Sequence, residues 1–218
     1  MTFDPFGDFE TRGYLRNFAA EKSPERIRRL EHEAFRSRVG EALDALRTGT
    51  PLGYQDVLDT HGRLFGDVYP WAGEDRAQIA PVLAVGKAGR YDLFAHPRDV
   101  RRAAEYALAT ASDPARMRAR PGEVMGLLAH AHPFLDGNGR TIMVVLAELC
   151  RRAGIHVAWQ TVGKADHLAA LTHELERPGR ALDALLTPHV RRAPVSVARD
   201  AARSHGLPGL GPVDQGGD

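Results

Sequence analysis

The sequence predicts a mainly α-helical domain with one small β-hairpin. Apolar residues recur at every third or fourth position along most of the chain, which is the spacing of helices that bury one face. Only residues 77–95 combine strand-forming residues with a glycine-rich turn. The 218 residues are enough for one domain with a substantial core. We therefore expect one helical bundle that carries the hairpin.

Charge and cysteine content narrow the function classes. The chain has 29 Lys and Arg against 28 Asp and Glu, so its net charge of +1 does not favour binding to nucleic acid or to an anionic membrane. Its single cysteine, Cys150, excludes an intrachain disulfide, and we interpret it as a packing residue. Residues 1–14 contain acidic residues and no long apolar run. We therefore expect neither a secretory signal nor a membrane span, and predict a cytoplasmic protein.

The chain is expected to begin with an irregular arm, residues 1–22, followed by two helices. We expect the aromatic rings of this arm, including Phe18, to fill a groove on the domain. Ser23, which is followed by a proline, is a helix start, and the apolar spacing then continues to about Gly49. A shorter helix should span residues 54–65.

The predicted hairpin follows these helices. Its first strand should span residues 77–85, its turn residues 86–89 and its second strand residues 91–95. A single hairpin is only marginally stable in water, so it should lean on helices.

The second half of the chain reads as helices up to a glycine- and proline-rich end. Residues 116–120 look like a basic connector, and periodicity is lost beyond Arg191. We divide the chain into the arm (1–22), one domain (23–190) and a flexible tail (191–218). The helices expected here span about residues 97–113, 122–131, 139–154, 165–175 and 182–188.

One stretch between two of these helices carries chemistry: His132-Pro-Phe-Leu-Asp-Gly-Asn-Gly-Arg140. A glycine-rich turn that opens a helix presents unpaired N–H groups and the positive end of the helix dipole, which favour an anion. Gly137 and Gly139 permit close approach of the backbone, and Asn138 adds a side-chain donor. We therefore predict a phosphate site at this turn.

Three further side chains in the same stretch fit phosphate transfer. Asp136 is a hard oxygen ligand suited to a Mg²⁺ ion shared with phosphates. Arg140 has a planar fork that binds phosphate. His132 is of the residue type that can accept a proton near pH 7. A base, a metal ligand and a cation thus accompany the phosphate turn.

This stretch resembles the signature of the Fic family, which continues with two more residues and a second arginine. The resemblance implies a Fic-type helical bundle and transfer of a nucleotide moiety, usually AMP from ATP, to a hydroxyl of a target protein. It implies His132 as the general base and Asp136 as the Mg²⁺ ligand. Residues Gly137, Asn138, Gly139 and Arg140 would then bind the phosphates of the co-substrate ATP.

The segment Pro70–Glu74 also resembles Fic proteins, in which it precedes a hairpin beside the site. The resemblance implies that the predicted hairpin is a flap that aligns the target's chain by strand addition. Lys87 would lie near the tip of this flap and Tyr91 on its edge. The implied partner is a protein with a modifiable hydroxyl, and neither a nucleic acid nor a membrane is expected.

The sequence departs from the signature at Met143, where the family has its second arginine. A thioether cannot neutralise a terminal phosphate. We keep adenylyl transfer as the main hypothesis because the Gly-Asn-Gly turn is intact. Two alternatives stay open: transfer of another group, such as phosphate, UMP or phosphocholine, and a non-catalytic nucleotide-binding module. The presence of both a base and a metal ligand argues against the module.

Many Fic proteins are inhibited by a glutamate that follows Ser or Thr by four residues and pairs with the second arginine. The nearest string here, Thr172–Glu176, is followed by Arg177, and the partner arginine is replaced by Met143. We expect no self-inhibition through that contact. Any brake would come from a small antitoxin protein, from another contact, or would not exist.

Overall fold

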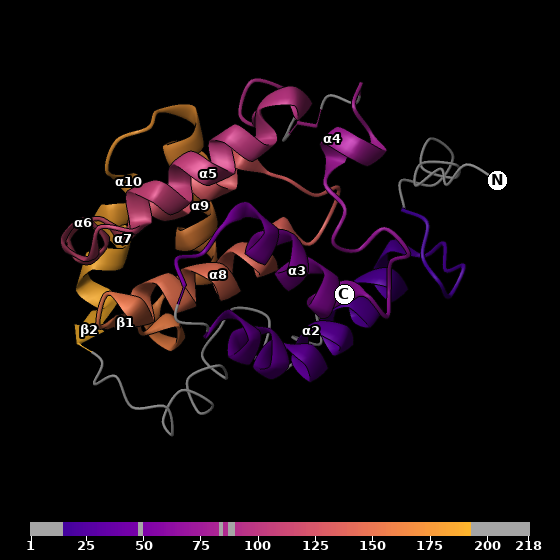
Figure 1. Ribbon diagram of the computed structural model, residues 1–218, viewed down its shortest axis with the longest axis horizontal. Helices are drawn as coiled ribbons and strands as arrows, with labels where there is room; N and C mark the ends of the chain where they lie inside the picture. The colour runs from indigo at the N-terminus through magenta and orange to yellow at the C-terminus, as the bar shows by residue number, and fades with distance from the viewer. Residues whose placement is uncertain (1–14, 48–49, 83–84, 87–89, 193–218) are drawn as a thin grey trace.

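Helix α8 (Asn138–Arg152) lies at the centre of the helical bundle (Figure 1). The computed structural model describes residues 15–47, 50–82, 85–86 and 90–192. Residues 142–146 of α8 are all buried, so this helix is covered on nearly every side. Helices α2 (Pro24–Leu46), α3 (Tyr54–Phe65) and α7 (Pro121–Ala131) pack against it. None of the helices in these ranges is long and apolar enough to cross a membrane.

The first two helices form as predicted. Ser23 caps α2 by accepting a hydrogen bond from the N–H of Arg26 at 3.5 Å. The described part of the arm packs against the loop after α3, where the fully buried Trp71 donates its ring N–H to the carbonyl of Arg16. Leu15 is buried there, whereas Phe18 is 65% exposed. The prediction that Phe18 fills a groove is therefore wrong, and the aromatic residues before it lie outside the described residues.

The first strand is expected to span residues 77–85. Its first residues form the helical turn α4 (Arg76–Ile79) instead, so the prediction is wrong there. Asp75 starts this turn by accepting the N–H of Gln78 at 3.0 Å, which favours helical over extended backbone. In the described part of residues 77–95, Arg90 forms an isolated β-bridge and no strand is present. Lys87 lies outside the described residues, and Tyr91 is 64% exposed.

Helix α5 (Val100–Ala111) follows the short helix η1 (Pro97–Asp99), and a further helix then interrupts the predicted connector. This helix, α6 (Pro114–Ala119), starts at Asp113, which accepts the N–H of Ala115 at 2.8 Å. A proline directly after the cap fits the first helical position. Residues 116–119 are therefore helical, and the prediction of a basic connector between two helices is wrong there.

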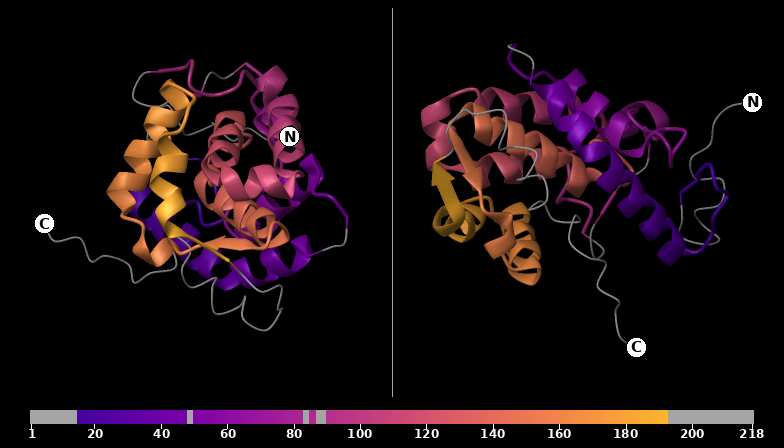
Figure 2. Two further views of the ribbon diagram at one scale, coloured as in Figure 1. Left: turned by 90° about the vertical axis from the view of Figure 1, so that its left-hand side faces the viewer. Right: turned by 90° about the horizontal axis from the view of Figure 1, so that it is seen from below.

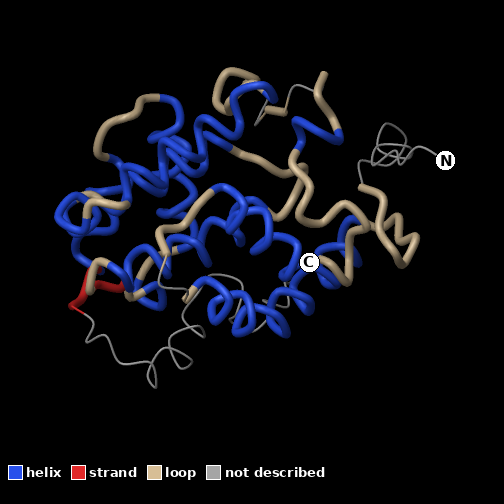
Figure 3. The backbone as a smooth tube through the Cα atoms, in the orientation of Figure 1, coloured by secondary structure: helices blue, strands red, loops and turns tan. Residues whose placement is uncertain are grey.

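The C-terminal part contains the sheet of the described chain, which is drawn in red in Figure 3. Strand β1 (Ile155–Val157) pairs antiparallel with β2 (Val190–Arg192), with Ile155 opposite Arg192. The prediction of a mainly helical protein with one small pair of strands is confirmed; the pair found in the described residues lies here, and the described part of residues 77–95 contains no sheet. The elements between the two strands are η2 (Trp159–Thr161), α9 (Lys164–Glu176), α10 (Ala181–Leu186) and η3 (Thr187–His189).

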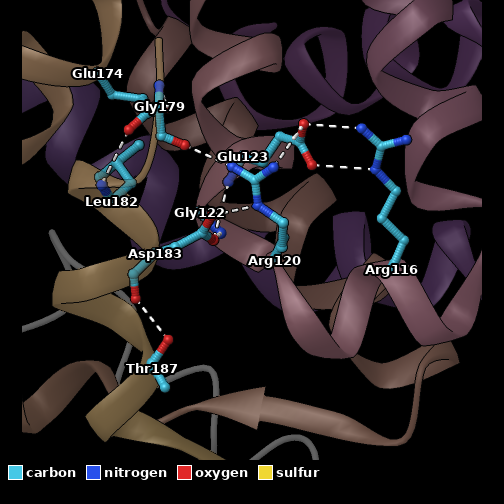
Figure 4. A network of polar contacts seen from close by, with 9 residues as sticks. All are labelled: Arg116, Arg120, Gly122, Glu123, Glu174, Gly179, Leu182, Asp183 and Thr187. Atoms are coloured by element: carbon cyan, nitrogen blue, oxygen red, sulfur yellow. Dashed lines mark hydrogen bonds and ion pairs between the residues drawn. The ribbon is translucent and has the colours of Figure 1, made fainter. Parts of the chain in front are cut away.

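Helices α9 and α10 gather on one side of the bundle (Figure 2), where they hold the start of α7. The buried carboxylate of Asp183 accepts the N–H groups of Gly122 and Glu123 at 2.7 and 3.2 Å and pairs with Arg120 at 3.0 Å (Figure 4). These N–H groups have no acceptor within their own helix, so Asp183 replaces the missing carbonyls. Glu174 of α9 in turn accepts the N–H of Gly179 at 2.9 Å, which fixes the loop before α10.

We predict that Asp183→Ala lowers the free energy of unfolding by about 1–3 kcal/mol, because it leaves buried N–H groups without acceptors. Asp44→Ala is the matched control. It removes an ion pair with Arg47 from the surface of α2, where the Asp44 side chain is 72% exposed, and should change stability by less than about 0.5 kcal/mol. Urea unfolding measures both. Equal losses would show that Asp183 does not anchor α7.

Candidate active site

The loop between α7 and α8, residues 132–137, begins with a strained turn that hydrogen bonds from another part of the chain stabilise. His132 ends α7 with its backbone in the left-handed region, at φ 44° and ψ 60°, a conformation that residues other than glycine rarely adopt. The buried guanidinium of Arg76 donates to the His132 carbonyl at 2.7 Å and also to the carbonyl of Ala95. The N–H of Arg76 donates to the carbonyl of Pro133 at 2.8 Å. Arg76 therefore fixes the turn and ties it to the chain before α5.

The His132 ring is held neutral. It stacks on Phe94 with 3.8 Å between ring centroids. Burial, helped by the positive charge of Arg76, lowers the pKa of His132 to about 3, although a hydrogen bond to the carbonyl of Ala129 opposes this shift. One ring nitrogen carries the hydrogen of that bond, so the other nitrogen is left as a proton acceptor.

A second buried histidine, His61 of α3, supports the loop from inside. Its Nδ1 accepts the N–H of Gly73 at 2.9 Å, so Nε2 carries the hydrogen and donates to the carbonyl of Asp136 at 3.1 Å. Its ring stacks on Phe134 at 3.8 Å. Burial lowers the pKa of His61 to about 3. These contacts give His61 a structural role in supporting the loop.

The Gly-Asn-Gly turn uses its three residues differently. Gly137 has φ 74°, and a Cβ there would lie 2.6 Å from the Phe65 ring. Asn138 is buried, and its amide binds the N–H and the carbonyl of Phe134 at 2.9 and 2.7 Å. The Asn138 side chain thus closes the loop from within. A Cβ on the exposed Gly139 would meet no atom within 4 Å, so this glycine leaves open space at the start of α8.

Anion and metal chemistry fit the outer face of this turn. The first N–H groups of α8 have no acceptors within the helix and lie at the positive end of its dipole. Asp136 is 52% exposed, and its Oδ1 accepts the N–H of Gly137 at 2.6 Å, which leaves Oδ2 for a cation. Among the described residues, no three His, Cys, Asp or Glu side chains form a metal cluster. A single carboxylate suits Mg²⁺, which is usually held by one or two carboxylates together with substrate phosphates.

Arg140 extends from the first turn of α8 toward α2 and is held there. Its Nη2 lies 2.8 Å from Oε1 of Glu31 and 4.0 Å from Oδ1 of Asp136. Its guanidinium carbon lies 4.7 Å from the centroid of the Phe65 ring. Glu31 is buried and also accepts the hydroxyl of Tyr69 at 2.8 Å. Burial and the charge of Asp136 raise the pKa of Glu31, against the opposing effect of Arg140.

The structure therefore brings six of the eight predicted site residues into one loop and helix start. These six are His132, Asp136, Gly137, Asn138, Gly139 and Arg140; of the other two, Tyr91 is exposed and Lys87 lies outside the described residues. Cys150 is buried, which raises the pKa of its thiol to about 12 and agrees with packing rather than reactivity.

Sequence reasoning missed Glu31 and Arg76, whose roles depend on partners far along the chain. Met143 and Glu176, which stand at the two positions of the inhibitory contact, are not part of the loop. Met143 is 3% exposed in the core, and Glu176 lies 3.5 Å from Arg90.

We predict opposite outcomes for alanine at the two glycines of the turn. Gly137→Ala should lower the free energy of unfolding by about 1–3 kcal/mol, because alanine is strained in the left-handed conformation and its Cβ would clash with the Phe65 ring. Gly139→Ala, the matched control, should leave stability unchanged or raise it by up to about 1 kcal/mol, since alanine favours the helix. Urea unfolding compares them. A similar loss in both variants would contradict the different roles.

We predict that the His132 ring stays neutral well below pH 6.5 in the folded protein, because its pKa is lowered to about 3. NMR of the ring nitrogens, assigned by loss of the signal in His132→Ala, measures this. The unfolded chain takes up the proton at about pH 6.5, so the free energy of unfolding should fall as the pH drops below that value. A midpoint near 6.5 in the folded protein would contradict the burial argument.

Comparison with known proteins finds related sequences. The Fic/DOC family model matches residues 51–150. The chain is 32% identical over 149 residues to "Probable protein adenylyltransferase y4lH" of Sinorhizobium fredii. The matched region covers 64% of this chain and 72% of that protein. It is 31% identical over 165 residues to "Protein adenylyltransferase VbhT" of Bartonella schoenbuchensis, covering 75% of this chain. The chain spans 34% of the length of VbhT.

Solved structures share the fold. The BepC protein of Bartonella tribocorum, solved with bound AMPPNP, has a TM-score of 0.67 and 20% identity, over 83% of this chain and 93% of that one. The Fic domain of a Bep effector protein of Bartonella quintana, solved with bound ADP, has a TM-score of 0.66 and 22% identity, over 85% and 94% of the two chains. These likenesses establish the arrangement of the helices.

Proposed function

Because this chain belongs to the Fic/DOC family, we propose that it is a protein adenylyltransferase, which moves AMP from ATP to a Ser, Thr or Tyr hydroxyl of a target protein. One observation carries the proposal: a neutral histidine and the positive end of α8 lie at the two ends of the loop 132–137. A base and an anion site are the two groups that nucleotide transfer to a hydroxyl requires. Two relatives that carry the name protein adenylyltransferase support the same reaction.

In this proposal the phosphates of ATP bind at the first turn of α8. The unpaired N–H groups there and the open space beside Gly139 suit a diphosphate. Arg140, whose side chain is 23% exposed, supplies a positive charge and further donors. Asp136 would hold Mg²⁺, which when bound neutralises phosphate charge and withdraws electrons from phosphorus.

The proposed reaction is one displacement at phosphorus. The target hydroxyl oxygen forms a bond to the α-phosphorus of ATP, the bond from that phosphorus to the bridging oxygen breaks, and pyrophosphate leaves. His132 takes the hydroxyl proton on its free ring nitrogen. The N–H groups of α8 and the Arg140 guanidinium stabilise the negative charge that develops on the phosphate oxygens.

We propose that the target lies along residues 77–95, in which Lys87 and Tyr91 are the expected contacts. The position of Phe94 supports this proposal, because its ring stacks on His132 and this segment therefore leads to the base. The N–H of Ala95 also donates to the carbonyl of His130 at 2.8 Å, which fixes the end of the segment on α7. An extended target chain beside this segment would present its hydroxyl near the base.

We predict that His132→Ala nearly abolishes transfer while ATP binding stays within about twofold, because the base contributes on the order of 10²–10⁴-fold and does not hold the nucleotide. Mass spectrometry after incubation with Mg²⁺, ATP and a lysate measures the gain of AMP on hydroxyl side chains. Calorimetry measures binding. Full transfer by the variant would disprove the role of His132, and no gain by the native chain with any nucleotide would favour a binding module.

A second candidate is transfer of another group by the same site. It is favoured by the buried Met143, which provides no cation for the terminal phosphate. Without that cation the donor could bind in the reverse direction and transfer its γ-phosphate, or a UMP or phosphocholine donor could replace ATP. A mass gain of one phosphate in place of AMP would select this alternative.

We propose that any inhibition of this chain does not use the pair of a glutamate and the second motif arginine through which many Fic proteins are inhibited. A small antitoxin protein is the proposed inhibitor, and another contact of the chain is the alternative. Met143 supports this proposal, because it offers no charge for an inhibitory glutamate to bind. The proposed setting is the cytoplasm, where ATP and Mg²⁺ are abundant.

A further inference from the structure

Glu31 is a buried carboxylate that points from α2 to the proposed phosphate site. It is 3% exposed, and its Oε1 lies 2.8 Å from Nη2 of Arg140. The same oxygen accepts the hydroxyl of Tyr69 at 2.8 Å. Burying a carboxylate is costly unless it is paired and hydrogen-bonded. This carboxylate has both kinds of partner, and one of them is the arginine of the motif.

The pairing engages one nitrogen of the Arg140 guanidinium. Both carboxylates near it, those of Glu31 and Asp136, approach Nη2, at 2.8 and 4.0 Å. The guanidinium has five N–H donors in a rigid plane. No other ion pair of Arg140 is found within the described residues, so its remaining donors are available to a phosphate. The Phe65 ring, 4.7 Å away, covers part of the group and limits its rotation.

Met143 makes this arrangement more important. It stands three residues beyond Arg140, where the family signature has a second arginine, and it is 3% exposed in the core. Arg140 is therefore the only arginine that the motif itself offers to a nucleotide. A single long side chain with several rotatable bonds loses entropy when it is ordered on a ligand, and a contact that fixes it beforehand removes that cost.

We propose that Glu31 is a positioning residue, which holds Arg140 by one nitrogen and directs its other donors to a phosphate of the nucleotide. This inference rests on the proposed function, because it assumes that Arg140 contacts the nucleotide. The pair stays formed when the nucleotide binds. If Arg140 swung away, the Glu31 carboxylate would be left buried with only the Tyr69 hydroxyl and would face the like charge of Asp136.

A double-mutant cycle tests the proposal. Calorimetry gives the Kd for ATP with Mg²⁺, and the transfer assay gives the rate, for the native chain, Glu31→Gln, Arg140→Gln and the double variant. Glu31→Gln should weaken ATP binding by about tenfold, within the range of couplings between contacting residues. In the Arg140→Gln background the same change should have less than about a twofold effect. Two losses that multiply would show that Glu31 acts independently of Arg140, and would overturn the proposal.

Two further variants control for general damage to the fold. Glu33→Gln changes an exposed carboxylate on the same helix and should leave the Kd unchanged. Tyr69→Phe removes the second hydrogen bond of Glu31 and should weaken ATP binding less than Glu31→Gln does. Urea unfolding of every variant identifies any that fail to fold. If Glu31→Gln unfolds the chain, Tyr69→Phe replaces it in the cycle. The effect of Tyr69→Phe on the Kd for ATP is then compared between the native and the Arg140→Gln background.

The outcomes separate this inference from the proposed function. If the native chain binds ATP but transfers no AMP, the proposed function fails while the binding cycle still tests Glu31. If it transfers AMP and the losses multiply, the inference fails alone. If it binds no ATP, both fail.

Discussion

The ring of His61 must stay neutral for the loop between α7 and α8 to keep its shape. Its Nδ1 accepts one backbone N–H while its Nε2 donates to the carbonyl of Asp136, 75 residues away in the sequence. A second proton would turn the acceptor into a donor that faces the N–H of Gly73. The stack of this ring on Phe134 and its nearness to Gly137 leave no room for another side chain. The position of the phosphate turn therefore depends on one uncharged imidazole in the core.

The rest of the bundle holds the two helices that meet at this loop. Asp183 fixes the start of α7, and Arg76 fixes its end, so the helix that carries His132 is held at both ends. Helix α8 is buried along most of its length and is joined to α2 through Arg140 and Glu31. Groups on rigid elements stay closer to their working geometry than groups on loops, which is a requirement for proton and phosphate transfer.

Much of the fold could be predicted from the sequence because its signals are local. The helix start at Ser23, the apolar spacing of α3 and the glycine turn at Gly137 all act within a few residues, and each is found where it was expected. The first strand is predicted wrongly at its start, because the strand-forming residues after Asp75 favour a strand in the sequence pattern. In the structure the side chain of Asp75 caps a helical turn there. Helix α6 was missed because its basic residues hid the start at Asp113.

The supporting residues of the site could not be found in this way. Arg76 binds the carbonyl of a residue 56 positions later, and Glu31 meets an arginine of the second half of the chain. Glu31 stands among charged residues of α2, and the sequence does not distinguish it from its solvated neighbours. Only the packing of α2 against α8 buries this carboxylate and gives it a partner. The motif shows the chemistry, while long-range contacts determine its geometry.

The most direct test of the account is a crystal structure with AMPPNP and Mg²⁺. We expect the bridging phosphates at the first turn of α8 beside Gly139, with the free ring nitrogen of His132 facing the α-phosphorus and Arg140 still paired with Glu31. Phosphates bound elsewhere, or Arg140 turned away from Glu31 onto the nucleotide, would contradict the account.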